Sequence, residues 1–114
     1  MIAASASAAT RPAIICGYTP KAAVRPSACD VWRGFEYNSR AFAHIHWASW
    51  GSKQATSKGI ETGEHYPLLH IPAGLTAYHP ARGCNGALYF VRLRVTEAHG
   101  APWILGLPLP RCKK

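Results

Sequence analysis

Hydrophobic and polar residues alternate with a period of two along several short stretches of the chain. The clearest stretch covers residues 87–96, which are rich in β-branched and aromatic side chains. One face of this stretch carries Tyr89, Val91, Leu93 and Val95, and the other carries Leu88, Phe90, Arg92 and Arg94. This pattern is typical of a strand between an apolar core and solvent, so we predict a strand whose second face is mostly exposed.

A second strand is predicted within residues 31–50, a stretch that is rich in aromatic residues and free of proline. Its alternating residues are Ala43, Ile45 and Trp47 on one face and His44, His46 and Ala48 on the other. This alternation places Trp47 on the core side and Trp50 on the opposite, exposed side, just before the turn at Gly51.

Four further segments complete the predicted strands. Residues 54–62 are polar and contain threonine, which favours an exposed or edge strand after a hairpin. Residues 67–71 and 75–79 are short strand candidates, separated by the turn sequence Pro72-Ala73-Gly74. Residues 102–109 contain prolines that restrict a last strand to the edge of a sheet.

Residues 11–31 contain several prolines and a glycine, which predicts a looped N-terminal arm with little regular structure. No segment has a sustained helical apolar period, and the sequence has no internal repeats. We therefore predict a single all-β domain over residues 11–114, a small antiparallel β-sandwich or barrel.

The cysteines stand at positions 16, 29, 84 and 112, and no two of them form a C-x-x-C pair. An even number in a short chain indicates disulfides rather than a zinc or redox site. Of the three possible connectivities we favour Cys16 to Cys29 and Cys84 to Cys112, because each closes a local loop. In the chain-entropy model these loops stabilise the fold by about 3 and about 3.5 kcal/mol.

Residues 1–10, M-I-A-A-S-A-S-A-A-T, contain A-x-A steps like those of a signal-peptidase site. Two interpretations stay open: the remnant of a signal peptide, or an ordinary disordered Ala/Ser terminus. Together with the cysteines, the first interpretation predicts a secreted, extracellular protein. No stretch approaches the roughly 20 apolar residues that span a bilayer, so we expect no membrane-spanning segment.

The chain has 13 Lys and Arg against 5 Asp and Glu, a formal charge of +8. The cations are scattered from Arg11 to Lys114, and such a general positive field favours polyanionic partners, including anionic surface polymers, lipid headgroups and acidic proteins. Phe90 beside Arg92 and Arg94 has the composition of a single-strand nucleic-acid binder. An exported protein rarely meets that ligand, so nucleic acid is not an expected partner.

Residues 45–51 read I-H-W-A-S-W-G and are followed by Ala55-Thr56, Gly59, Cys84-Asn85-Gly86 and Tyr89. This pattern resembles that of small secreted actinobacterial proteins with no assigned activity, in which I/L-x-W-x-x-W-G precedes A-x-G-x-G, C-x-G and an aromatic strand. Here Ser57-Lys58 replaces a glycine-threonine step, and the cysteine often found between the two blocks is missing, which leaves Cys112 to pair with Cys84. The resemblance implies export and a β fold, and no activity.

The tripeptide Trp32-Arg33-Gly34 is similar, in its first two positions, to the W-R-Y tripeptide of secreted actinobacterial α-amylase inhibitors. Those inhibitors are all-β proteins with two disulfides, so the resemblance implies an enzyme-inhibiting role. In this chain the tripeptide follows the second cysteine instead of lying inside the first disulfide loop.

His44 and His46 lie two residues apart on a predicted strand, so their imidazoles project from one face and could bind a metal with His65, His70 or His79. The spacing is common, and we favour histidines without a metal and expect no cofactor.

The sequence offers little support for a catalytic site. Asp30, beside Cys29, is the only aspartate available to a serine triad, and Glu61 and Glu64 form a carboxylate pair that is more simply explained as solvated. We expect no enzyme.

Trp32, Arg33, Trp50 and Trp103 are the candidate contact residues, because tryptophan and arginine dominate binding hot spots. The alternative is that each indole fills the core or covers a sheet edge. The expected function is a secreted, cationic, non-catalytic binding domain of unknown target, and one candidate target is an extracellular enzyme that it inhibits. The alternatives are binding to a surface polymer and a cationic antimicrobial or toxin-like action.

Overall fold

The computed structural model describes residues 11–16, 21–31, 40–62, 70–98, 100–110 and 112. In this part of the chain every regular element is a β-strand, which confirms the all-β prediction. None of the described residues belongs to a helix long and apolar enough to cross a membrane. The N-terminal stretch 1–10 lies outside the described residues.

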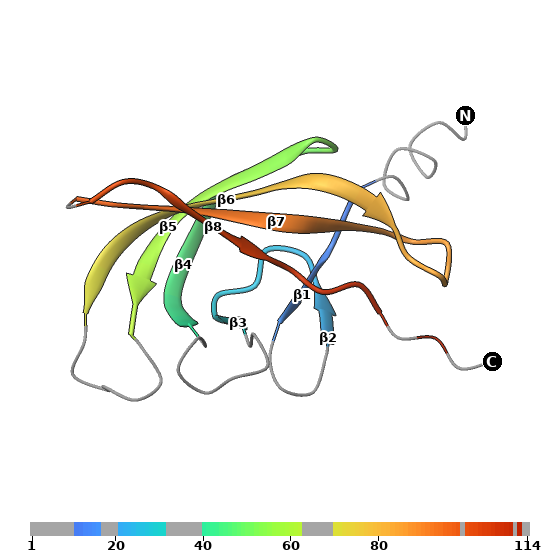
Figure 1. The fold of residues 1–114 in the computed structure, drawn as a ribbon, viewed down its shortest axis with the longest axis horizontal. Helices are drawn as coiled ribbons and strands as arrows, with labels where there is room; N and C mark the ends of the chain where they lie inside the picture. Colours follow the sequence, from blue (N-terminus) through green and yellow to red (C-terminus); the bar gives the residue numbers. More distant parts are fainter. Residues whose placement is uncertain are drawn as a thin grey trace.

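The described strands form two antiparallel sheets (Figure 1). The larger sheet has six strands, each paired with its neighbour in the chain: β3 (Cys29–Val31), β4 (Arg40–Trp50), β5 (Gln54–Glu61), β6 (Ile71–Arg82), β7 (Leu88–Glu97) and β8 (Trp103–Gly106). The smaller sheet pairs β1 (Ile14–Cys16) with β2 (Lys21–Ala23).

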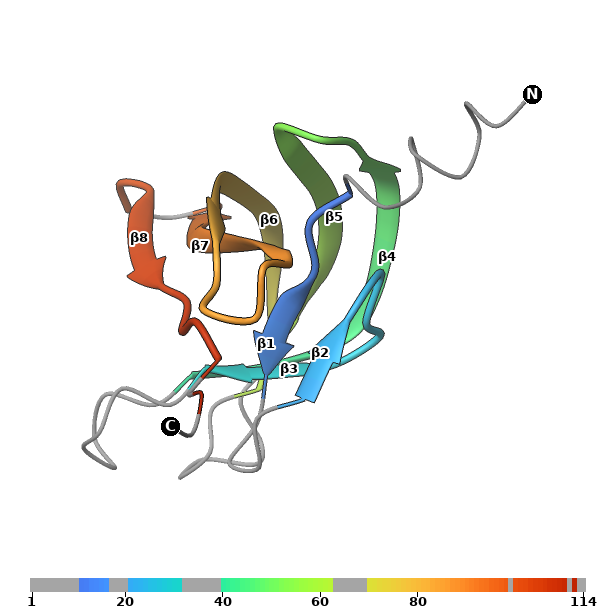
Figure 2. The ribbon, with the colours of Figure 1, turned by 90° about the vertical axis from the view of Figure 1, so that its right-hand side faces the viewer.

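The six strands curl into a half-barrel, and β1 lies on its concave side (Figure 2). The chain just before β1 bonds to β7, because Ala13 donates its N–H to the carbonyl of Leu88 and accepts the N–H of Phe90, at 3.1 and 3.0 Å. The other end of β1 is joined to β3 by the Cys16–Cys29 disulfide. The segment therefore connects two distant strands of the curled sheet.

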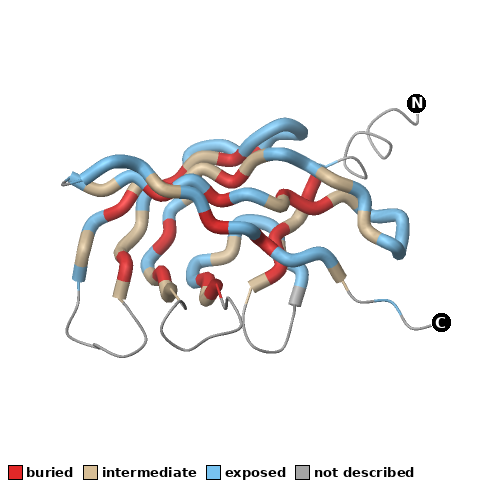
Figure 3. Tube along the Cα trace, viewed as in Figure 1, coloured by how far each residue is buried: buried red, intermediate tan, exposed pale blue. Residues whose placement is uncertain are grey.

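The core lies on the concave face, and buried and exposed positions alternate along the long strands (Figure 3). On β7, Leu93 and Val95 are buried. Arg92, which precedes Leu93, and Arg94, which lies between the two, are exposed. The largest fully buried side chains come from β1, β4, β6, β7, β8 and the residue before Ala13: Phe42, Phe90, Ile14, Leu75, Leu105, Val95 and Pro12.

The N-terminal arm is more regular than the sequence predicts. The described residues of this arm, 11–16 and 21–31, include three short strands, and Ile14, Ile15 and Val31 are at most 4% exposed. The arm carries apolar side chains that cover the concave sheet, and its described prolines, Pro12 and Pro26, lie outside its strands.

Two predictions for the middle of the chain are also wrong. β5 is a central strand rather than an edge strand, because β6 pairs with it from Gln54 to Glu61. Pro72-Ala73-Gly74 lies within β6 and forms no turn. Pro72 pairs with Ile60 of β5 and lies just beyond the ladder between β6 and β7, which ends at Ala73. The prolines near β8 do accompany an edge strand, as predicted.

Trp50 is buried, with 5% of its surface exposed, so the prediction that it is exposed is wrong. The pairing of β4 with β5 is irregular between Trp47 and Ser49. A bulge adds one residue and reverses the faces beyond it, so Trp50 points to the same side as Ile45. Its indole N–H donates to the buried carbonyl of Pro12 at 2.8 Å. Trp47 packs against the core, as predicted.

Phe90 is fully buried, which contradicts its predicted place on the solvent face of β7. Its ring contacts that of Trp50 edge-on, with centroids 5.7 Å apart. The change of face coincides with His79 on the neighbouring strand β6, whose φ is +60°. Phe90 is therefore not available to stack on a nucleic-acid base.

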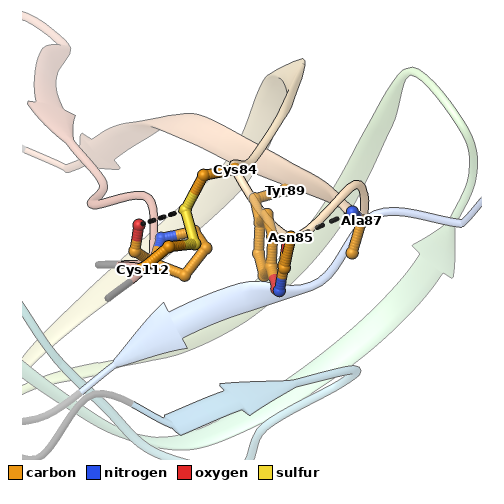
Figure 4. The surroundings of a disulfide bond; sticks show 6 residues. Cys84, Asn85, Ala87, Tyr89 and Cys112 are labelled. Atoms are coloured by element: carbon orange, nitrogen blue, oxygen red, sulfur yellow. Dashed lines mark hydrogen bonds between the residues drawn. A yellow bond between two sulfur atoms is a disulfide. The ribbon is translucent and has the colours of Figure 1, made fainter. Parts of the chain in front are cut away.

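Both predicted disulfides are present, Cys16–Cys29 and Cys84–Cys112. The second joins the turn after β6 to the segment after β8 (Figure 4). In that turn Asn85 donates to the hydroxyl of Tyr89 at 2.8 Å and accepts the N–H of Ala87 at 3.1 Å.

The two disulfides are expected to contribute unequally to stability. Cys29 is 5% exposed and belongs to the core, whereas Cys84 and Cys112 are exposed. Cys16→Ala with Cys29→Ala should lower the free energy of unfolding by about 4 kcal/mol, more than Cys84→Ala with Cys112→Ala, as measured by urea denaturation. Loop length alone favours the opposite order, since the separations are 13 and 28 residues. An equal or larger loss in the second variant would contradict the structural argument.

Candidate functional site

The convex face of the larger sheet carries an ordered set of cations and polar side chains. On β7, Arg92 and Arg94 are exposed and lie opposite Tyr78 and Thr76 of β6. Residues two apart on a strand are separated by roughly 7 Å, and neighbouring strands by about 5 Å. The two guanidinium groups therefore project from one small area beside an aromatic ring and a hydroxyl.

The same face continues over β5 and β4. Lys58 and His46 are exposed and pair directly across these two strands. Beside them, the hydroxyls of Ser49 and Thr56 are hydrogen-bonded at 2.8 Å. The outer face is the set of these convex side chains: His46, Ser49, Thr56, Lys58, Thr76, Tyr78, Arg92 and Arg94.

Acidic side chains are separated from this outer face. Among the described residues the acids are Asp30, Glu61 and Glu97. Glu61 is 5% exposed and bonds with Glu97 on the concave side, while Asp30 belongs to the edge strand β3. None of the eight residues that define the outer face is acidic.

The structure does not assemble the predicted tryptophan surface. Trp32 and Arg33 lie outside the described residues, and Trp50 is inside the core. Trp103 is half-buried, and the guanidinium carbon of Arg40 lies 5.3 Å from the centre of its ring. Trp103 is thus the one predicted contact residue that the described structure leaves partly exposed.

His44 and His46 are both exposed, with the buried Ile45 between them. A second irregularity in the pairing of β4 with β5 lies between Ala43 and His46, and within it His44 has a φ of +51°. Gly59 of β5 lies against it, since a Cβ there would meet the carbonyl oxygen of Ala43 at 3.2 Å. No group of three or more potential metal ligands occurs in the part of the chain that the structure describes. His65 lies outside it.

A pair of carboxyl groups on the concave side is the feature that sequence reasoning missed. Glu61 forms a side-chain hydrogen bond with Glu97. Glu64, its partner in the predicted carboxylate pair, lies outside the described residues. The Nε atom of Arg40 is 3.5 Å from the Oε2 atom of Glu61. Burial, the hydrogen bond with Glu97 and the negative charge of Glu97 raise the pKa of Glu61 to about 7, although the charge of Arg40 lowers it.

The alternation of inward and outward side chains along β5 and β7 indicates that both glutamates point inward. On β5, Ala55 and Ser57 point inward, and Glu61 continues that series. On β7, Glu97 follows the inward series of Leu93 and Val95. An acid at an inward position of a strand needs a partner, and the partner lies two strands away, where no local pattern reveals it.

Fold and site together define a small all-β domain with a curled sheet, two disulfides and a cationic outer face. Comparisons of the chain with protein-family models, with curated proteins and with solved structures found no match.

The carboxyl pair should make stability depend on pH. Because the pKa of Glu61 is raised from 4.5 to about 7 on folding, its contribution is fully present below pH 4.5 and is lost as the pH rises through 7. We expect a loss on the order of 2–3 kcal/mol in the free energy of unfolding across this window, measured by urea denaturation.

Glu61→Gln is the matching variant, because a neutral amide can still donate to Glu97. It should flatten the pH dependence and be more stable than the wild type at pH 8. A variant that loses stability with pH as the wild type does would show that Glu61 is not the group responsible.

Proposed function

We propose that the chain is a secreted, non-catalytic domain that binds an anionic extracellular polymer through its outer face. The observation that carries the proposal is the exposure of Arg92, Arg94, Lys58 and His46 on one face, without a described acid among them.

The chemistry of these side chains suits a polymer with phosphate or carboxylate groups. Arginine donates two parallel hydrogen bonds to either group, and a lysine adds a mobile positive charge. Tyr78 and Thr76 beside the arginines offer an aromatic surface and a hydroxyl to the uncharged parts of a repeat unit. A polymer can engage several such cations at once, so weak single contacts add up through multivalency.

The disulfides support the extracellular part of the proposal. All four cysteines are paired, and disulfides persist mainly in oxidising compartments. Two disulfides in a small domain are compatible with such a location.

Inhibition of an extracellular enzyme, the other role expected from the sequence, rested on Trp32, Arg33, Trp50 and Trp103. Trp32 and Arg33 lie outside the described residues. Trp50 is buried in the core, where its indole N–H is hydrogen-bonded to the carbonyl of Pro12, and Trp103 is partly covered by Arg40. The outer face presents more exposed contact groups than these, and for this reason we favour the polymer.

The test is retention on immobilised inorganic polyphosphate, with neutral dextran as the blank. Arg92→Gln with Arg94→Gln should weaken binding at least tenfold at low salt and reduce the slope of log affinity against log salt by about 2.

The matched control is Arg11→Gln with Arg25→Gln, which removes the same charge from the N-terminal segment, where both arginines are exposed. The control should lose much less affinity. Equal losses in the two variants would show that net charge, not the outer face, is responsible, and no binding by the wild type would reject this polymer class.

A further inference from the structure

The outer face is a regular grid, because β5, β6 and β7 pair in register across it. Thr56, Thr76 and Arg94 lie side by side in one row, and Lys58 and Gly74 lie side by side in the next row. Arg94 and Lys58 are therefore on opposite sides of β6 and one row apart.

The cations of this face form two groups with an uncharged strip between them. Neighbouring strands are about 5 Å apart and successive rows about 7 Å apart, so the backbone positions of Arg94 and Lys58 are separated by about 12 Å. Arg92 lies one row farther from Lys58. Between the two groups β6 presents Gly74 and Thr76, neither of which is charged.

The strip over β6 offers hydroxyl groups and an unfilled position. A Cβ atom added to Gly74 would have only two atoms of Thr96 within 4 Å apart from its chain neighbours, the carbonyl oxygen at 3.8 Å and Cβ at 3.9 Å. In the adjacent row Thr76 lies beside Thr56, whose hydroxyl is hydrogen-bonded to that of Ser49 at 2.8 Å. A ligand group that crosses β6 therefore meets hydroxyls and open space.

The curl of the sheet favours a flexible ligand. The sheet bends between β5 and β7, so the two groups of cations point in different directions (Figure 2). A stiff rod touches such a convex surface along one line. A flexible chain can bend over β6 and contact both groups at once.

The spacing of the cations favours a chain whose charges are separated by neutral, hydroxyl-bearing units. Arg92, Arg94 and Lys58 can each bind a phosphate, and the hydroxyl of Thr76 can form hydrogen bonds with the units between them. Inorganic polyphosphate carries a charge on every unit, so its charges above β6 would lie opposite no cation. A single-stranded nucleic acid also has spaced phosphates, but its bases need aromatic side chains for stacking, and Tyr78 is the only aromatic residue of the outer face.

We propose that the outer face binds a flexible polyol phosphate, a chain in which phosphodiester groups alternate with hydroxyl-bearing carbon units. The chain crosses β6, with phosphates on Arg92 and Arg94 at one end and on Lys58 at the other. Its polyol units lie on Thr76 and over Gly74. This inference rests on the proposed function and narrows the class of polymer that it names.

The first test compares the affinities of three short probes with equal numbers of phosphates at one salt concentration: a glycerol phosphate oligomer, inorganic polyphosphate and oligothymidylate. The glycerol phosphate oligomer should bind about fivefold more tightly than the other two, because its units add a hydrogen bond to Thr76.

Polyphosphate binding at least as tightly as the glycerol phosphate oligomer would overturn this inference and leave the proposed function standing. No binding of either phosphate polymer would reject both. Oligothymidylate binding at least as tightly would assign the face to nucleic acid and also overturn the inference.

Thr76→Val tests the contact with the polyol units, because valine keeps the branched shape and the strand preference of threonine without its hydroxyl. It should weaken binding of the glycerol phosphate oligomer about fivefold and leave binding of polyphosphate unchanged. An equal effect on both probes, or no effect on either, would show that the polyol units do not lie on Thr76.

Lys58→Gln tests whether the chain crosses β6. It should reduce the slope of log affinity against log salt for the glycerol phosphate oligomer by about 1. Lys53→Gln is the matched control, because Lys53 is exposed in the turn between β4 and β5, and it should leave the slope unchanged. An unchanged slope in Lys58→Gln, or an equal change in the two variants, would overturn the proposed crossing.

Discussion

The attachment of β1 to two distant strands is the constraint on which the rest of the molecule depends. A curled antiparallel sheet buries its concave face only if something fills it, and here Ile14 and Pro12 do so. The hydrogen bonds of Ala13 to β7 and the disulfide from Cys16 to β3 hold this segment in place. Without them the apolar concave face would be open to water.

The curled sheet also places basic and acidic side chains on different sides. Along each long strand, successive side chains point alternately to the filled side and to the convex side. Arg92 and Arg94 thereby reach solvent, while the acids that end β5 and β7 turn toward the filled side. Lys58, which lies far from Arg92 and Arg94 in the sequence, is thereby brought onto one face with them. The outer face and the carboxyl pair of Glu61 and Glu97 are two results of this one geometry.

The sequence predicts the fold class, the disulfide pairing and the strand around Val95, because local patterns and cysteine spacing determine them. It fails where pairing departs from strict alternation. The bulge before Trp50 reverses its face, and Phe90 is buried where the N-terminal segment meets β7. The partnership of Glu61 with Glu97 depends on a small residue, Ala73, in the strand between them. Such contacts arise from tertiary packing, which periodicity cannot reveal.

The parallel bridge between Ala13 and Tyr89 has a consequence for the order of folding. A contact between such distant residues requires most of the chain, so the half-barrel cannot close during early synthesis. The cysteines that join β1 to β3 are only 13 residues apart, so they can pair under oxidising conditions before the rest of the chain has folded. Early formation of this disulfide would thus fix β1 beside β3. The bridge from Ala13 to Tyr89 would form later, once β7 has folded.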